Sequence, residues 1–82
     1  MIYSEATLGK ILRNMYDNAP PKGKKTMIFL FGVKYGHIIE ENNFAISRIV
    51  DYSGIRITYQ KEVREGINLA QYVEIKPNMN TF

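Results

Sequence analysis

Side chains of the kinds that read DNA gather in one short part of the sequence. Residues 56–64, RITYQKEVR, hold two arginines and a lysine together with a glutamine and a threonine. Arginine and lysine can contact phosphates or guanine, and glutamine can bond to adenine through both atoms of its amide. We therefore predict a set of DNA-binding residues in and just before this segment: Arg48, Arg56, Thr58, Tyr59, Gln60, Lys61 and Arg64.

The segment follows a glycine turn between two predicted helices. Residues 44–53, FAISRIVDYS, bring Ile46, Ile49 and Val50 to one helical face, and Asn43 is expected to be the N-cap. Gly54 stands where a left-handed residue ends a helix, and Ile55 is the apolar residue that usually packs back on that helix. The pattern predicts a turn that brings the following helix back onto the first.

The second helix is predicted over residues 58–70, with Thr58 as its N-cap. Apolar residues of this helix at successive i+4 steps are expected to face the core. Two helices joined by a short glycine turn are typical of a helix-turn-helix, in which the second helix lies in the major groove. We interpret residues 44–53 as the supporting helix and 58–70 as the recognition helix.

Two further helices are predicted before this pair. Residues 4–18 show a helical apolar spacing with Ser4 as a cap and Glu5 in the first turn, and the prolines at 20 and 21 end the helix. Residues 26–43 begin with an apolar run that would also suit a buried strand. Apolar residues of this segment recur at helical spacing over about three turns, which favours a helix. Gly32 and Gly36 would let a neighbouring helix approach closely.

The C-terminal part alternates like a short strand over residues 72–76, YVEIK, before Pro77. A partner strand could come from residues 1–3, from 26–31 or from another chain, and residues 77–82 are expected to form a flexible tail. The predicted fold is mainly α: a single four-helix domain over residues 1–82 with a winged-helix-like helix-turn-helix and one C-terminal β-strand.

The composition excludes several classes of site. The chain has 82 residues and one histidine, His37. It has no cysteine, which rules out disulfides and thiolate metal sites. We find no pattern typical of a catalytic site, and we expect no enzyme activity, no metal and no cofactor. The start of the chain does not resemble a secretion signal and no apolar run would cross a bilayer, so a cytoplasmic location and no membrane partner are expected.

The net charge of +3 favours a polyanionic partner, and the basic excess lies mostly between residues 10 and 34. Lys22, Lys24 and Lys25, in a predicted loop, are candidates for weaker phosphate contacts. A monomer with few such contacts would bind weakly, so we expect a homodimer on double-stranded DNA.

The alternative is a protein-docking or inhibitor module of a bacterial or phage defence-related system that binds no DNA. Helix corners with glycine also occur in helical domains that bind no DNA, and Asp51, Glu62 and Glu65 would repel phosphates if they faced the duplex. An exposed apolar patch would favour a protein partner, and its candidate residues are Phe44, Tyr52, Tyr72, Met79 and Phe82.

The order of the sequence segments is also similar to that of a known family. The chain resembles a family of small bacterial HTH-like domains that are found alone or attached to restriction and modification enzymes. The resemblance lies in two successive segments, LGKILRNMYDNAPPKGKKTMIFLFGVKYG and ISRIVDYSGIRITYQKEVREGINLAQYV. The similarity covers roughly residues 7–73 and is strongest in MYDNAP, LFGVKYG, SGI and GINLAQYV. It implies a compact helical domain linked to DNA or to DNA-processing partners, and it assigns no individual DNA contact.

Overall fold

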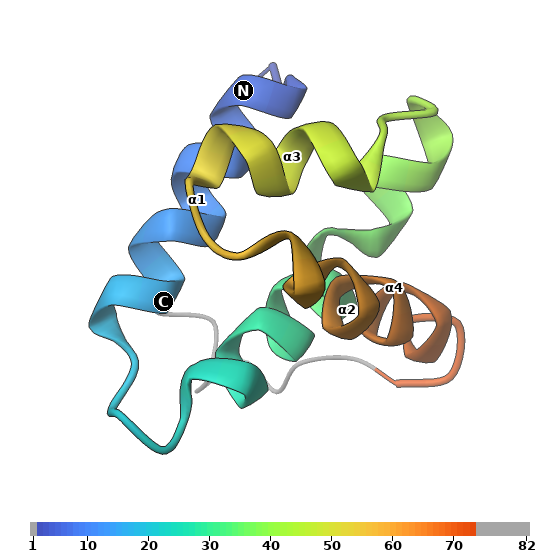
Figure 1. The fold of residues 1–82 in the computed structure, drawn as a ribbon. Coiled ribbons are helices and arrows are strands. Elements are labelled where there is room, and N and C mark those ends of the chain that lie inside the picture. The colour runs from blue at the N-terminus through green and yellow to red at the C-terminus, as the bar shows by residue number, and fades with distance from the viewer. Residues whose placement is uncertain (1, 74–82) are drawn as a thin grey trace.

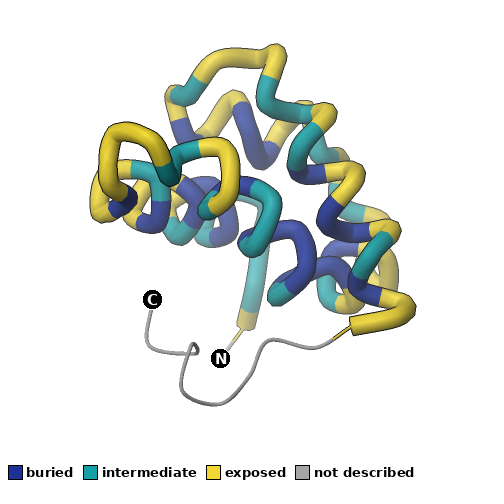
Figure 2. Tube along the Cα trace, turned by 90° about the horizontal axis from the view of Figure 1, so that it is seen from below, coloured by how far each residue is buried: buried dark blue, intermediate teal, exposed yellow. Residues whose placement is uncertain are grey.

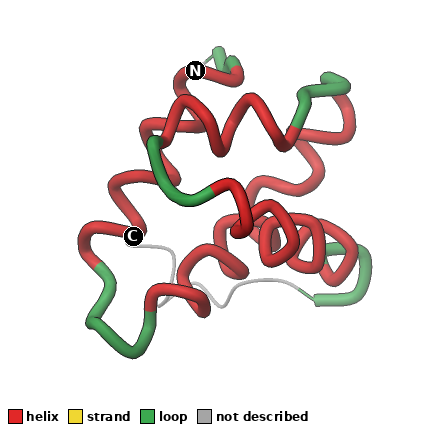
Figure 3. The backbone as a smooth tube through the Cα atoms, viewed as in Figure 1, coloured by secondary structure: helices red, strands yellow, loops and turns green. Residues whose placement is uncertain are grey.

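Residues 2–73 are described in the computed structural model of the chain, and all of their regular structure is helical (Figures 1 and 3). Four α-helices and one short 3₁₀ helix follow in the order α1 (Glu5–Asn18), α2 (Lys24–Glu41), α3 (Ile46–Ser53), η1 (Ile57–Tyr59) and α4 (Gln60–Leu69). The mainly helical prediction with four helices is therefore confirmed.

The helices pack as two pairs around one core. The most extensive contacts join α2 to α4 and α1 to α3. In Figure 2 the buried positions of the helices turn toward a shared interior, and seven large side chains there are fully buried: Leu8, Leu12, Ile28, Phe31, Ile49, Val50 and Val63. Each α-helix thus supplies part of one apolar core.

Helix α1 begins as predicted. The Ser4 hydroxyl accepts a hydrogen bond from the Thr7 amide at 3.1 Å, and the Thr7 hydroxyl accepts one from the Ser4 amide at 2.7 Å. Two amides that a helix N-terminus would otherwise leave unpaired are satisfied in this way. After Asn18 the chain turns at Pro20, whose carbonyl accepts from the Gly23 amide at 2.8 Å.

Helix α2 confirms the helical interpretation of the apolar run at 26–31, but it starts earlier than predicted. It begins at Lys24, so Lys24 and Lys25 belong to its first turn rather than to a loop. Gly32 and Gly36 lie against α4, as their spacing predicts. A Cβ at Gly36 would stand 3.2 Å from the Cα of Ile67, and one at Gly32 would stand 3.0 Å from the Cα of Gly66.

The junction between α2 and α3 corrects the prediction for Asn43. This residue has a left-handed φ of 54°, and the amides of Asn43 and Phe44 donate to the carbonyls of Glu40 and Ile39. That pair of bonds is a Schellman motif, so Asn43 ends α2 instead of capping α3. The N-cap of α3 is Ala45, whose amide donates to the Glu5 carboxylate at 2.7 Å.

Tyr35 is a buried ionisable group in this core. Its ring packs against Phe31 and Tyr3, with centroid distances of 5.2 and 5.8 Å. Burial raises the pKa of the Tyr35 hydroxyl above its ordinary value, and the neighbouring Tyr3 raises it further. The neutral phenol is therefore the form that the fold favours.

The predicted strand at 72–76 is not supported. The amides of Tyr72 and Val73 both donate to the carbonyl of Leu69, which holds these residues in the turn that follows α4. Residues 74–76 and the predicted tail at 77–82 lie outside the described residues. Within 2–73 there is no strand, and no helix there is long and apolar enough to span a bilayer.

Candidate nucleic-acid interface

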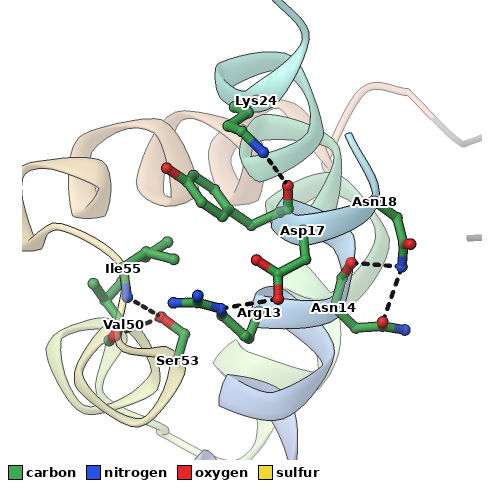
Figure 4. Close-up of polar contacts among 9 residues, drawn as sticks. Arg13, Asn14, Asp17, Asn18, Lys24, Val50, Ser53 and Ile55 are labelled. Atoms are coloured by element: carbon green, nitrogen blue, oxygen red, sulfur yellow. Dashed lines mark hydrogen bonds and ion pairs between the residues drawn. The ribbon is translucent and has the colours of Figure 1, made fainter. Parts of the chain in front are cut away.

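A buried serine holds the corner between α3 and the following helix. The Ser53 hydroxyl, 4% exposed as a residue, donates to the Val50 carbonyl at 2.5 Å and accepts from the Ile55 amide at 3.2 Å (Figure 4). Gly54 has a φ of 75°, a left-handed conformation that costs a residue with a Cβ about 1 kcal/mol or more. The predicted glycine turn is confirmed, and Ile55 packs against the core as expected.

The chain beyond the corner forms a 3₁₀ turn before α4. Ile57–Tyr59 make this turn, with the Tyr59 amide donating to the Arg56 carbonyl at 3.0 Å, and α4 begins at Gln60. Thr58 therefore lies inside η1, and the prediction that it caps the helix is wrong. The extra turn extends the helical segment toward the corner and carries Arg56, Ile57 and Thr58 into solvent.

One side of this segment presents a continuous exposed row. Residues three, four and seven apart share a helix face, and starting from Ile57 these positions hold polar and cationic side chains. Four members of the row are exposed and Gln60 is partly exposed. We define this row as the α4 stripe: Ile57, Gln60, Lys61, Arg64 and Asn68.

The two acidic residues of α4 are placed differently with respect to the stripe. Helical geometry places Glu62 away from Arg64. Glu65 is exposed and borders the stripe, because it lies four residues after Lys61 and three before Asn68. Within the described residues the Glu62 carboxylate has one oxygen that is buried and lacks a hydrogen-bond partner, so this side chain turns in toward the protein. The Glu62 carboxylate therefore does not interrupt the stripe, while Glu65 adds one exposed carboxylate at its edge.

Two of the predicted contact residues have intramolecular partners. The Tyr59 ring is partly buried and meets the edge of the Tyr16 ring, with centroids 5.9 Å apart. Arg48 is 71% exposed, but one of its guanidinium nitrogens lies 3.8 Å from the carboxylate of Glu5. Tyr59 therefore positions the start of α4, and the charge of Arg48 is partly balanced.

The three lysines predicted as phosphate contacts do not form one group. Lys24 donates from Nζ to the Tyr16 carbonyl at 2.9 Å (Figure 4), and its ammonium lies 4.4 Å from the centre of the Tyr16 ring. Lys22 and Lys25 are exposed. Lys24 thus closes the C-terminal end of α1, and of these three lysines Lys22 and Lys25 are the exposed ones.

Arg13, which the sequence reasoning did not select, lies beside the corner. Its guanidinium is within 3.6 Å of the position that a Cβ on Gly54 would take, and its Nε donates to Asp17 at 3.0 Å (Figure 4). Two members of the stripe, Ile57 and Asn68, were also missed as contact residues. Extending the helical spacing three residues toward the N-terminus from Gln60 would have found Ile57.

A shallow hollow adjoins the stripe. It has a volume of about 400 Å³ and lies where the end of α2 and the start of α3 meet α4, with Arg64 and Asn68 on its α4 side. Its apolar lining comes from Ile39, Phe44, Ile46 and Ile67. Among residues 2–73 there is no cluster of three or more histidine or acidic side chains that could hold a metal ion.

Comparisons with known proteins give one match. No curated protein and no solved structure matches the chain. A family model described as an HTH-like domain matches residues 4–76, which include every helix described above. The corner at Gly54 and the exposed helix that follows it agree with this description. The chain belongs to the family of HTH-like domains.

Proposed function

We propose that the protein binds double-stranded DNA by placing the α4 stripe in the major groove, with α3 as the supporting helix. Membership of the HTH-like family favours this kind of role. The observation that carries the proposal is the stripe itself, where Lys61 and Arg64 are exposed on one side of α4 while Glu62 turns away. Helix-turn-helix proteins read base edges with such residues.

Phosphate contacts would come from cations outside the stripe. Arg56 is exposed just before η1, Lys22 and Lys25 are exposed near the start of α2, and Arg13 lies next to the turn. So few contacts give weak binding at physiological salt. We therefore propose a homodimer on paired half-sites, in a regulatory role or as an accessory to a DNA-processing or defence system, with no catalytic activity of its own.

Fluorescence anisotropy with a random duplex across a salt series tests the proposal. Binding at about 50 mM salt should weaken steeply toward about 200 mM, and Lys61→Ala and Arg56→Ala should each lower the slope of log K against log salt by about 1. Lys34→Gln is the matched control, because helical spacing from Gly32 and Gly36 places Lys34 on the side of α2 away from α4. It should leave the slope unchanged.

The competing function is a protein-docking module without DNA binding. Two aromatic residues favour it, since Tyr52 is 57% and Tyr72 is 81% exposed. Phe44, from the same predicted patch, packs partly against the core, and Met79 and Phe82 lie outside the described residues. Absence of duplex binding at about 50 mM salt would favour this function over the first.

A further inference from the structure

Ile57 is an apolar side chain at the cationic tip of the recognition segment. It is the first residue of η1, and it is 60% exposed while Ile55, two residues earlier, packs against the core. Its neighbours in sequence, Arg56 and Thr58, are both exposed and polar. The fold therefore holds a branched aliphatic group in solvent between two side chains suited to DNA.

The register of Ile57 ties it to the residues proposed to read bases. Lys61 is four positions and Arg64 seven positions further along, so all three lie on one side of the segment. Gln60 is three positions away, which is one full turn of the 3₁₀ geometry seen in η1. Ile57 thus forms the N-terminal end of the α4 stripe and is not a member of the core face.

The chemistry of the major groove offers one apolar group at a base edge. Thymine carries a 5-methyl group there, whereas adenine, guanine and cytosine carry no methyl group in the same groove. An aliphatic side chain gains free energy when it meets this methyl and both lose contact with water. The N-terminal turn of a recognition helix is the part that reaches the base edges.

We propose that Ile57 contacts a thymine 5-methyl group and makes thymine a preferred base at one position of each half-site. This inference rests on the proposed DNA binding, and it adds a specificity residue to that function. The neighbouring Gln60 and Lys61 are available to bond to adjacent base pairs, while Arg56 is placed to hold the backbone.

The test separates the methyl group from every other feature of the base. Duplexes that bind the protein are first selected from a randomised pool, and each thymine of the selected site is then replaced singly by deoxyuridine. Uracil keeps the hydrogen-bonding atoms of thymine and lacks only the methyl group. We expect one replacement to weaken binding of the unmodified protein about threefold to tenfold, as burial of a single methyl group implies.

Ile57→Ala should bind the thymine and deoxyuridine duplexes equally at that position, and Ile57→Val should retain part of the difference. The matched control is Ile2→Ala, because Ile2 is 92% exposed and lies outside the helix-turn-helix. This control should keep the full difference. Thermal melting followed by circular dichroism verifies that each variant is folded.

Two results would overturn the inference while leaving DNA binding intact: equal affinity of the unmodified protein for both kinds of duplex at every thymine, or a difference that persists in Ile57→Ala. Failure to bind any duplex at about 50 mM salt would overturn the inference and the proposed function together. The two failures are distinguished by whether the selected duplex is bound at all.

Discussion

Gly32 of α2 and Gly66 of α4 face each other with no side chain between them. A Cβ on either glycine would lie 3.0 Å from the Cα of the other. Such a Cβ at Gly32 would also collide with the Val63 carbonyl, and one at Gly66 with the Phe29 carbonyl. This contact sets how closely α4 lies on α2, and with it the position of the stripe.

We expect Gly32→Ala and Gly66→Ala each to lower the free energy of unfolding by about 1–3 kcal/mol, because the helices must separate to admit a methyl group next to backbone atoms. Alanine favours a helix over glycine by about 1 kcal/mol, which offsets part of this loss. Urea denaturation measures the change. Gly36→Ala, whose Cβ would keep 3.2 Å from its nearest neighbours, should cost less, and equal stability of all three variants would contradict this account of the contact.

Replacing Glu5 should destabilise the start of α3. Its carboxylate accepts from the Ala45 amide at 2.7 Å and also faces Arg48, and Ala45 has no side chain that could serve as a cap. Loss of a helix cap costs about 0.5–2 kcal/mol, so Glu5→Ala should lower the free energy of unfolding by that amount in chemical denaturation.

Glu5→Gln should cost less, because the amide oxygen can still accept the hydrogen bond. Arg48→Ala removes only the exposed ion pair and should change stability by less than about 1 kcal/mol. A larger loss for Arg48→Ala than for Glu5→Ala would show that the ion pair, rather than the cap, is what stabilises this junction.

Lys24 should act on stability and not on DNA affinity. Its ammonium bonds to the Tyr16 carbonyl and lies over the Tyr16 ring, so Lys24→Met should lower the free energy of unfolding by about 1 kcal/mol. The salt slope of DNA binding should stay unchanged. Lys25→Met, at the exposed neighbouring position, is the control and should leave stability unaltered. A salt slope lowered by about 1 in Lys24→Met, with no loss of stability, would restore its role as a phosphate contact.

Ionisation of Tyr35 should contribute to the loss of folding stability at alkaline pH. Burial raises the pKa of Tyr35 in the folded protein above the ordinary 10.0, so above about pH 10 the unfolded chain loses this proton first and the free energy of unfolding falls as the pH rises. Tyr35→Phe keeps the ring contacts and cannot ionise. Its unfolding free energy should fall less steeply than that of the unmodified protein between about pH 9 and 11. Parallel declines would mean that Tyr35 is not responsible.

Local patterns were sufficient for the helices and for the corner. The apolar spacing of 4–18, 26–43, 44–53 and 58–70 predicted four helices in their correct places to within a few residues. Ser53, Gly54 and Ile55 form their turn through bonds that span at most three residues. Such features depend on neighbours in the sequence, which is why they could be predicted without the fold. Most of the exposed cations near residues 56–64 could likewise be selected as candidate DNA contacts from the local sequence pattern.

The tertiary structure decided the features that join distant residues. The cap of α3 comes from Glu5, forty positions before Ala45, so local reasoning chose Asn43 instead. Alternation at 72–76 predicted a strand, but a strand needs a partner, and the first two of these residues bond back to Leu69. The sequence alone determined the helices and their polar and apolar sides, because helical spacing is a local property. Only the tertiary packing decided that Arg48 lies near Glu5 and that Lys24 lies on Tyr16, because these contacts join residues of different helices.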